Sequence, residues 1–163
     1  MSRWRRPHGQ YVRQTADWFV SRLMSGGATQ AASAGLFSAV NLANDSVQGL
    51  FLHVVGLDFF IPSTTAFGKL TTRVGLTFSG QSAGYQASVS PMGALGPGFC
   101  KAQAQTGING TILYTLGGGQ IPYTWVHPWP LIILPPGYTL TVYSSVSNVD
   151  ITAAWYWLPM EPE

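Results

Sequence analysis

The sequence predicts an all-β protein, an antiparallel β-sandwich or jelly roll with an extended N-terminal arm. Most of the chain consists of runs rich in Val, Leu, Ile, Phe, Tyr and Thr, which are separated by clusters of Gly, Pro and Asn. Residues 68–78 place Leu70 and Leu76 on one face and Arg73 on the other, which is typical of a half-buried strand. Residues 150–158 are apolar on both faces, which favours a strand packed between two layers or in a subunit interface.

The N-terminal segment is expected to lie outside this sandwich. Residues 1–13 show no regular period and predict an extended arm. Residues 15–24 can form a short helix capped by Thr15, and residues 25–35 are small, which is typical of a flexible linker. We therefore expect an arm, short helix and linker over residues 1–34, a sandwich domain over residues 35–158, and a tail over residues 159–163.

Within the sandwich, the strands follow from the apolar runs and the turns from the residues between them. The sequence NDSVQG after the first run predicts a hairpin, because Asn, Asp and Gly tolerate left-handed backbone. Residues 79–110 predict a long loop with one strand near 99–105, and the Pro- and Gly-rich residues 117–130 predict a rigid surface loop. The other expected strands are 36–43, 50–61, 68–78, 111–116, 130–134, 138–146 and 150–158.

The composition indicates a protein that associates with other proteins. The 163 residues fit one domain, and only 9% of them are charged, against about 25% in ordinary soluble domains. A neutral surface lacks the charge repulsion that keeps monomers apart, so we expect partners that include further copies of the chain. The charge is also uneven: five arginines and Asp17 make the first 22 residues basic, the body is neutral, and Glu161 and Glu163 end the chain.

The few groups that could do chemistry lack the patterns that chemistry needs. Cys100 is the only cysteine, so an intrachain disulfide and a cysteine-based metal cluster are excluded, and a reducing compartment is expected. The three histidines form no metal-binding pattern. We expect no catalytic, metal or cofactor-binding residues, no secretory signal and no membrane-spanning segment.

The acidic residues of the body also predict structural roles. Asp45 and Asp150 lie in or beside turns, where aspartate commonly binds nearby backbone. Asp58 interrupts an apolar strand and is expected to form an ion pair with Arg73 on a neighbouring strand. Cys100 is expected to be a small buried apolar residue.

Two segments are candidates for binding a partner. The basic arm could contact nucleic acid, but the body adds no basic residues in excess, so the interpretation favours an acidic protein surface bound by arginines and tryptophans. The aromatic loop could lie in an interface or stack on a sugar ring. The arm residues are Arg3, Trp4, Arg5, Arg6, Tyr11, Arg13, Trp18 and Arg22, and the loop residues are Tyr123, Trp125, His127 and Trp129.

Two stretches carry a resemblance to a known group of proteins. FSAVNLANDSVQGLFLHVVGLDFF and PLIILPPGYTLTVYSSVSNVDITAAWYW resemble small β-sandwich virion proteins of tailed bacteriophages, over roughly residues 35–158. The resemblance implies a virion protein assembled in the host cytoplasm, a homotrimeric capsid decoration (cement) protein whose arm attaches to the major capsid or connector protein. The alternative is a carbohydrate- or receptor-binding adhesin of a head or tail fibre. Residues 79–110 have no counterpart in this resemblance.

Overall fold

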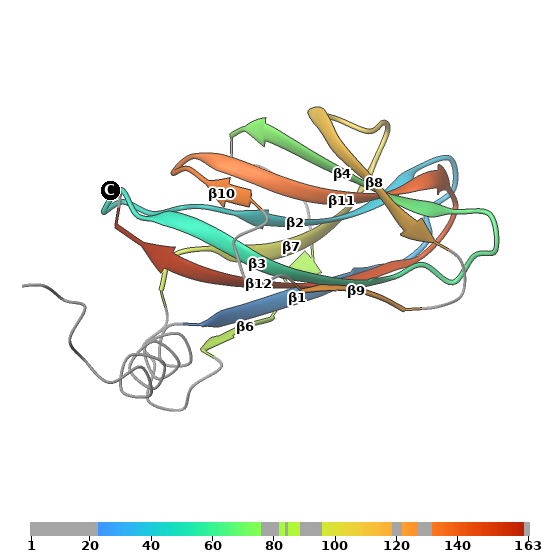
Figure 1. Cartoon of the computed structure of the whole chain (residues 1–163). Coiled ribbons are helices and arrows are strands. Elements are labelled where there is room, and N and C mark those ends of the chain that lie inside the picture. Colours follow the sequence, from blue (N-terminus) through green and yellow to red (C-terminus); the bar gives the residue numbers. More distant parts are fainter. Residues whose placement is uncertain are drawn as a thin grey trace, which may run out of the picture.

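The computed structural model describes residues 23–75, 82–83, 85–88, 96–118, 122–126 and 132–161. These residues form twelve strands and no helix, arranged as two antiparallel six-stranded sheets that pack face to face (Figure 1). The expected β-sandwich is confirmed. The arm and nearly all of the expected helix lie outside the described residues.

The first sheet, sheet A, contains two of the three ten-residue strands of the fold, β3 and β12. β12 (Ile151–Met160) lies between β3 (Phe51–Phe60) and β1 (Met24–Gln30). β6 (Tyr85–Ser88) continues the sheet beyond β1. On the other side of β3, two short strands pair one after the other with different parts of it: β10 (Ile132–Leu134) and β9 (Tyr123–Val126).

The second sheet, sheet B, has β11 (Tyr138–Ser147) between β2 (Phe37–Ala43) and β4 (Phe67–Val74). β8 (Thr111–Gly118) pairs with β4 and forms one edge. β7 (Phe99–Gln105) pairs with β2, and β5 (Ser82–Ala83) follows it at the other end of the sheet order.

The strand order is that of a jelly roll. The pattern is clear once β5, β6 and β7 are set aside as an insertion. The first strand then pairs with the last (β1 with β12) and the second with the next to last (β2 with β11). In the same way, β3 pairs with β9 and β10, and β4 pairs with β8. The pairs β12–β3 and β11–β4 then join these ladders into two sheets. The insertion widens both sheets, since β7 pairs with β2 and β6 pairs with β1. This order is the double Greek key of jelly rolls.

The expected hairpin at NDSVQG is wrong. β2 belongs to sheet B and β3 to sheet A, so residues 44–50 form an arch from one sheet to the other. The Asn44 side chain fixes the arch, because its amide donates to the carbonyl oxygens of Leu50 (2.9 Å) and Leu134 (2.8 Å). Turn-forming residues reverse the chain in either arrangement, so they do not indicate whether the two strands pair with each other.

The expected flexible linker is also wrong. Residues Met24–Gln30 form β1, an internal strand of sheet A that pairs with β12 on one side and β6 on the other. Its small residues suit this position, because Gly26 lies opposite the large Trp155 in the register. The sandwich therefore begins about ten residues before the expected boundary, and β12 ends at Met160, two residues into the expected tail.

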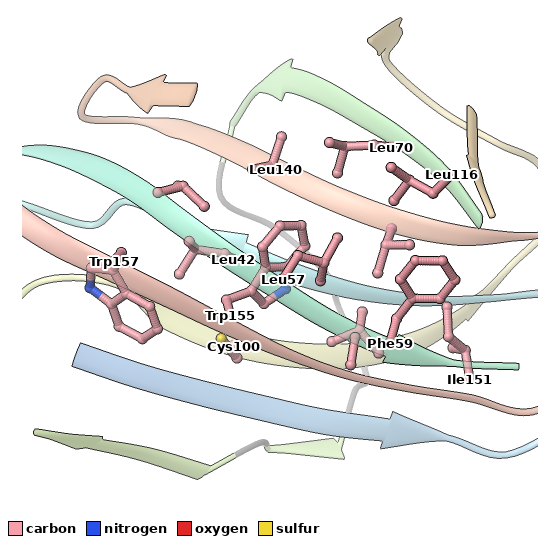
Figure 2. Packing of buried hydrophobic residues seen from close by; sticks show 14 of the residues in the cluster. Leu42, Leu57, Phe59, Leu70, Cys100, Leu116, Leu140, Ile151, Trp155 and Trp157 are labelled. Atoms are coloured by element: carbon pink, nitrogen blue, oxygen red, sulfur yellow. The ribbon is translucent and has the colours of Figure 1, made fainter. Parts of the chain in front are cut away.

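The core lies between the sheets, and its largest fully buried side chains are the two tryptophans of β12. Trp155 and Trp157 are fully buried, as are Leu42 of sheet B and Leu57 of sheet A, and Figure 2 shows Leu42, Leu57 and Trp155 grouped together, with Trp157 to one side of them. The indole Nε1 of Trp157 donates to the carbonyl oxygen of Pro97 at 3.0 Å. Fully burying side chains of this size contributes roughly 1.5–3 kcal/mol each, so β12 is a main source of stability.

The other face of β12 is only partly buried. Thr152 is exposed, Ala154 and Tyr156 are half-buried, and Leu158 is buried. The apolar pattern on both faces therefore corresponds to a central strand with one face in the core and one face of mixed exposure.

Candidate interaction surface

Most of the binding residues expected from the sequence lie outside the described residues. This holds for the whole arm set, Arg3, Trp4, Arg5, Arg6, Tyr11, Arg13, Trp18 and Arg22, and for His127 and Trp129. The backbone of Tyr123 and Trp125 belongs to β9, where these residues pair with Phe59 and Leu57. The expected surface loop over 117–130 is therefore interrupted by a strand of sheet A.

Cys100 has the structural role that its isolation in the sequence predicts. It lies on β7 with its side chain in the core, and desolvation by burial raises the pKa of its thiol. A thiol held in its protonated form is a poor nucleophile and a poor metal ligand. Among the described residues, no group of three His, Cys, Asp or Glu side chains is placed to hold a metal ion.

Asp45 and Asp150 bind backbone, as predicted, but across long stretches of sequence. A carboxylate oxygen of Asp45 accepts from the Gly98 N–H at 2.8 Å, and one of Asp150 accepts from the Ala32 N–H at 2.7 Å. Each aspartate thus ties a turn to a distant segment of the sandwich. These carboxylates hold the fold together.

The expected ion pair between Asp58 and Arg73 is wrong, because the two residues lie in different sheets. Asp58 is on β3 of sheet A and accepts a hydrogen bond from the Tyr156 hydroxyl at 2.8 Å. Arg73 is on β4 of sheet B, opposite Thr139. The apolar pattern of each strand did not indicate that β3 and β4 belong to different sheets.

The edge strand β8 exposes apolar side chains. Ile112 is 53% exposed and Tyr114 is 48% exposed, and Val74 at the end of neighbouring β4 is 73% exposed. Two register shifts against β4 leave Leu113 and Gly117 as extra residues, so β8 is bulged. Residues 106–118 contain no charged residue and no proline, the residues that commonly protect sheet edges.

The outward-facing side of sheet B is unusual in another way, because the outward-facing residues of its two central strands are buried and three cations lie beside them. One row across the sheet runs Lys101, Asn41, Thr141, Thr71 and Ile112, as the registers of five strands define it. Lys69 and Arg73 lie on the same face on either side of Thr71, since the intervening residue Leu70 is in the core.

The connection from β7 to β8 covers one end of this face. Ile108 packs against Ala39 and Tyr143, which lie on the outer side of β2 and β11. Burial raises the pKa of Tyr143, and the positive charge of Arg73 and the nearby polar groups of Asn109 oppose this shift. The connection packs closely against the backbone of β4 at Gly110. A Cβ added at Gly110 would lie only 2.6 Å from the Thr72 carbonyl oxygen.

The exposed edge strand β8 and the buried outward-facing side of sheet B were not predicted from the sequence. The side of each strand on which the cations lie could have been inferred from the sequence, because side chains alternate along a strand and both strands were expected. This places Lys69 and Arg73 on one side of β4, and Lys101 on the side of β7 opposite Cys100. That β7 and β4 belong to one sheet, with β2 and β11 between them, required the tertiary structure.

No family model matches the chain, and no curated protein and no solved structure is significantly similar to it. The class of protein is therefore the one that the fold defines, a jelly-roll β-sandwich. In its described part, no helix has both the length and the apolar character to cross a membrane.

Proposed function

We propose that this protein is a non-enzymatic structural module that works by assembling, first with copies of itself and then with a larger partner. The observation that carries the proposal is the exposed, uncharged edge strand β8 with Ile112 and Tyr114. Edge strands offer unpaired backbone groups to another chain, and exposed apolar side chains are covered when two copies associate. Because β8 is bulged, the side chains rather than a long backbone ladder carry the contact.

The resemblance to small virion proteins of tailed bacteriophages gives this proposal its specific form. It is a capsid decoration protein that forms a homotrimer in the virion and is fastened by its basic arm to the major capsid or connector protein. Support comes from the low charge of the chain and from the structural use of Cys100, Asp45 and Asp150 described above. No contact among the described residues favours the adhesin alternative over the decoration protein. A glycan array tests the adhesin alternative, and specific glycan binding by the wild-type protein would replace the decoration proposal.

Light scattering coupled to size-exclusion chromatography tests the assembly step. The wild-type protein is expected to run as a stable oligomer, a trimer in the specific form of the proposal, in the presence and absence of reductant. The double variant Ile112→Lys, Tyr114→Lys is expected to run as a folded monomer, because two exposed positions become charged and repel their counterparts.

The matched control is Val47→Lys, which changes an apolar residue that is 99% exposed at the β2–β3 arch, away from β8. This variant should keep the wild-type mass. A monomeric wild-type protein would contradict the proposal, and so would equal dissociation of the Val47 variant.

A further inference from the structure

The exposed large apolar side chains of the described residues gather mainly on one side of the sandwich. On the opposite side, β1 and β6 of sheet A contact β7 of sheet B. The other ends of the two strand orders, β9 and β10 in sheet A and β8 in sheet B, therefore lie on the same side, which we call the open side. Ile133 on β10 is 50% exposed there, and the open side also includes Ile112 and Tyr114 on β8.

The three strands of the open side come from a part of the chain that has no charged residue. Residues 102–149 contain no Asp, Glu, Lys or Arg, and they supply β8, β9 and β10. Lys101, the charged residue just before this stretch, is on β7 near the other end of the order of sheet B. Two copies that meet through their open sides therefore bring no like charges together, and their exposed apolar side chains leave water. A second copy of the chain is the partner that fits this side.

Ile112 and Ile133 point away from each other. Ile112 is opposite Thr71 in the register, and Leu70 beside Thr71 is in the core, so Ile112 is on the outward-facing side of sheet B. Ile133 precedes the core residue Leu134 and is therefore on the outward-facing side of sheet A. The open side thus has two apolar flanks that face in opposite directions, the β8 flank at Ile112 and the β10 flank at Ile133.

We infer that the copies form a closed ring in which the β8 flank of one copy packs against the β10 flank of the next, with the open sides turned toward the ring axis. The inference rests on the proposed self-assembly and states which surfaces of two copies meet. A ring needs a heterologous contact, which joins two different surfaces of the same chain, and the two flanks are such surfaces. Tyr114 is opposite the core residue Leu70, so at this edge it lies between the flanks and faces the axis where the copies meet.

A two-fold dimer would cover fewer of the exposed apolar residues. In a two-fold contact, a surface meets the same surface of the partner. A dimer through the β8 flank would leave Ile133 in water, and a dimer through the β10 flank would leave Ile112 in water, because the two side chains lie on different sheets. The ring covers both side chains in every copy. Since burial of apolar surface is favourable, the ring is the more stable arrangement.

Cysteine cross-linking of the full chain tests which surfaces meet. The variants are Ile112→Cys, Ile133→Cys and the double variant with both changes, each treated with a bismaleimide that joins two nearby thiols and then run on a denaturing gel. Cys100 is buried, so the wild type should give no cross-link. The double variant alone should form covalent species up to the full oligomer, because in the ring position 112 faces position 133 of the next copy. The matched control Val47→Cys, Ile112→Cys should stay uncross-linked, because Val47 is exposed at the β2–β3 arch, outside both flanks.

A charge substitution gives a second measurement. Ile133→Lys places a charge in the β10 flank and should convert the oligomer into a folded monomer, with the loss of mass followed by light scattering and the fold by tryptophan fluorescence. Three results overturn the inference: covalent dimers in either single cysteine variant, which indicate a two-fold contact; no cross-link in the double variant of an oligomeric protein; or an Ile133→Lys variant that keeps the wild-type mass. A monomeric wild type overturns the proposed function itself, so the two failures are distinguishable.

Discussion

Gly98 lies where the chain enters β7 and passes against the core tryptophan Trp157. Its φ is 103°, and a Cβ at this position would lie 2.9 Å from both the Leu52 Cδ1 and the Trp157 Nε1. The variant Gly98→Ala therefore combines two costs. Left-handed backbone in a residue with a Cβ costs about 1–2 kcal/mol, and overpacking of a core costs about 1–3 kcal/mol, so we expect a loss of about 3 kcal/mol in the free energy of unfolding.

A second glycine isolates the packing contribution. Gly35 has a φ of 73°, and a Cβ added there would meet no atom within 4 Å, so Gly35→Ala should cost only the backbone strain, about 1 kcal/mol. Alanine restricts the unfolded chain equally at both sites, and this effect cancels in the comparison. Urea titration followed by tryptophan fluorescence measures both free energies. If the two variants differ by less than about 0.5 kcal/mol, the contact between Gly98 and Trp157 does not constrain the core.

Two further predictions concern buried polar groups. Asn44→Ala removes the two hydrogen bonds that the Asn44 amide donates to backbone carbonyls and the one that its Oδ1 accepts from the Ser46 N–H, so it should lower the free energy of unfolding by about 2–4 kcal/mol. The control Ser33→Ala in an outer loop should change the free energy of unfolding by less than about 0.5 kcal/mol. Equal effects of the two variants in urea titrations would refute the role of Asn44. Burial raises the pKa of the Cys100 thiol, so the contribution of this thiol to the free energy of unfolding is complete below the pKa of an unfolded cysteine, about 8.5, and falls as the pH rises above that value. Cys100→Ala should therefore flatten the decline of stability between about pH 8.5 and 10.5. Identical pH profiles for the variant and the wild type would refute this role of Cys100.

The positions of most strands could be predicted from the sequence. Alternation and turn residues locate a strand because a half-buried strand must place apolar side chains at every second position. The expected strand near 99–105 corresponds to Phe99–Gln105, and 138–146 corresponds to Tyr138–Ser147. The burial of Cys100 was expected from the residue type, since a lone cysteine without catalytic partners nearby behaves as a small apolar residue.

Strands without large apolar residues could not be found in this way. β1 has the sequence MSGGATQ and is a strand because β12 and β6 pair with it on both sides. Its backbone hydrogen bonds are supplied by neighbours that lie more than 50 residues away in the sequence. β9 was missed for a related reason, because its flanking prolines and glycines dominate the local pattern.

The sequence by itself determined that this protein is built from strands, where most of them lie and that its surface carries few charges, because these properties depend on the period and the composition of neighbouring residues. Only the tertiary structure decided that the chain passes between the sheets at residues 44–50, that Asp58 and Arg73 lie in different sheets, and that Lys69, Arg73 and Lys101 share a face with Asn41 and Thr141. The physical reason is that the turns before and after a strand are compatible with its pairing to any of several other strands. The choice among them is made by burial of Trp155 and the rest of the core, which involves the whole chain at once.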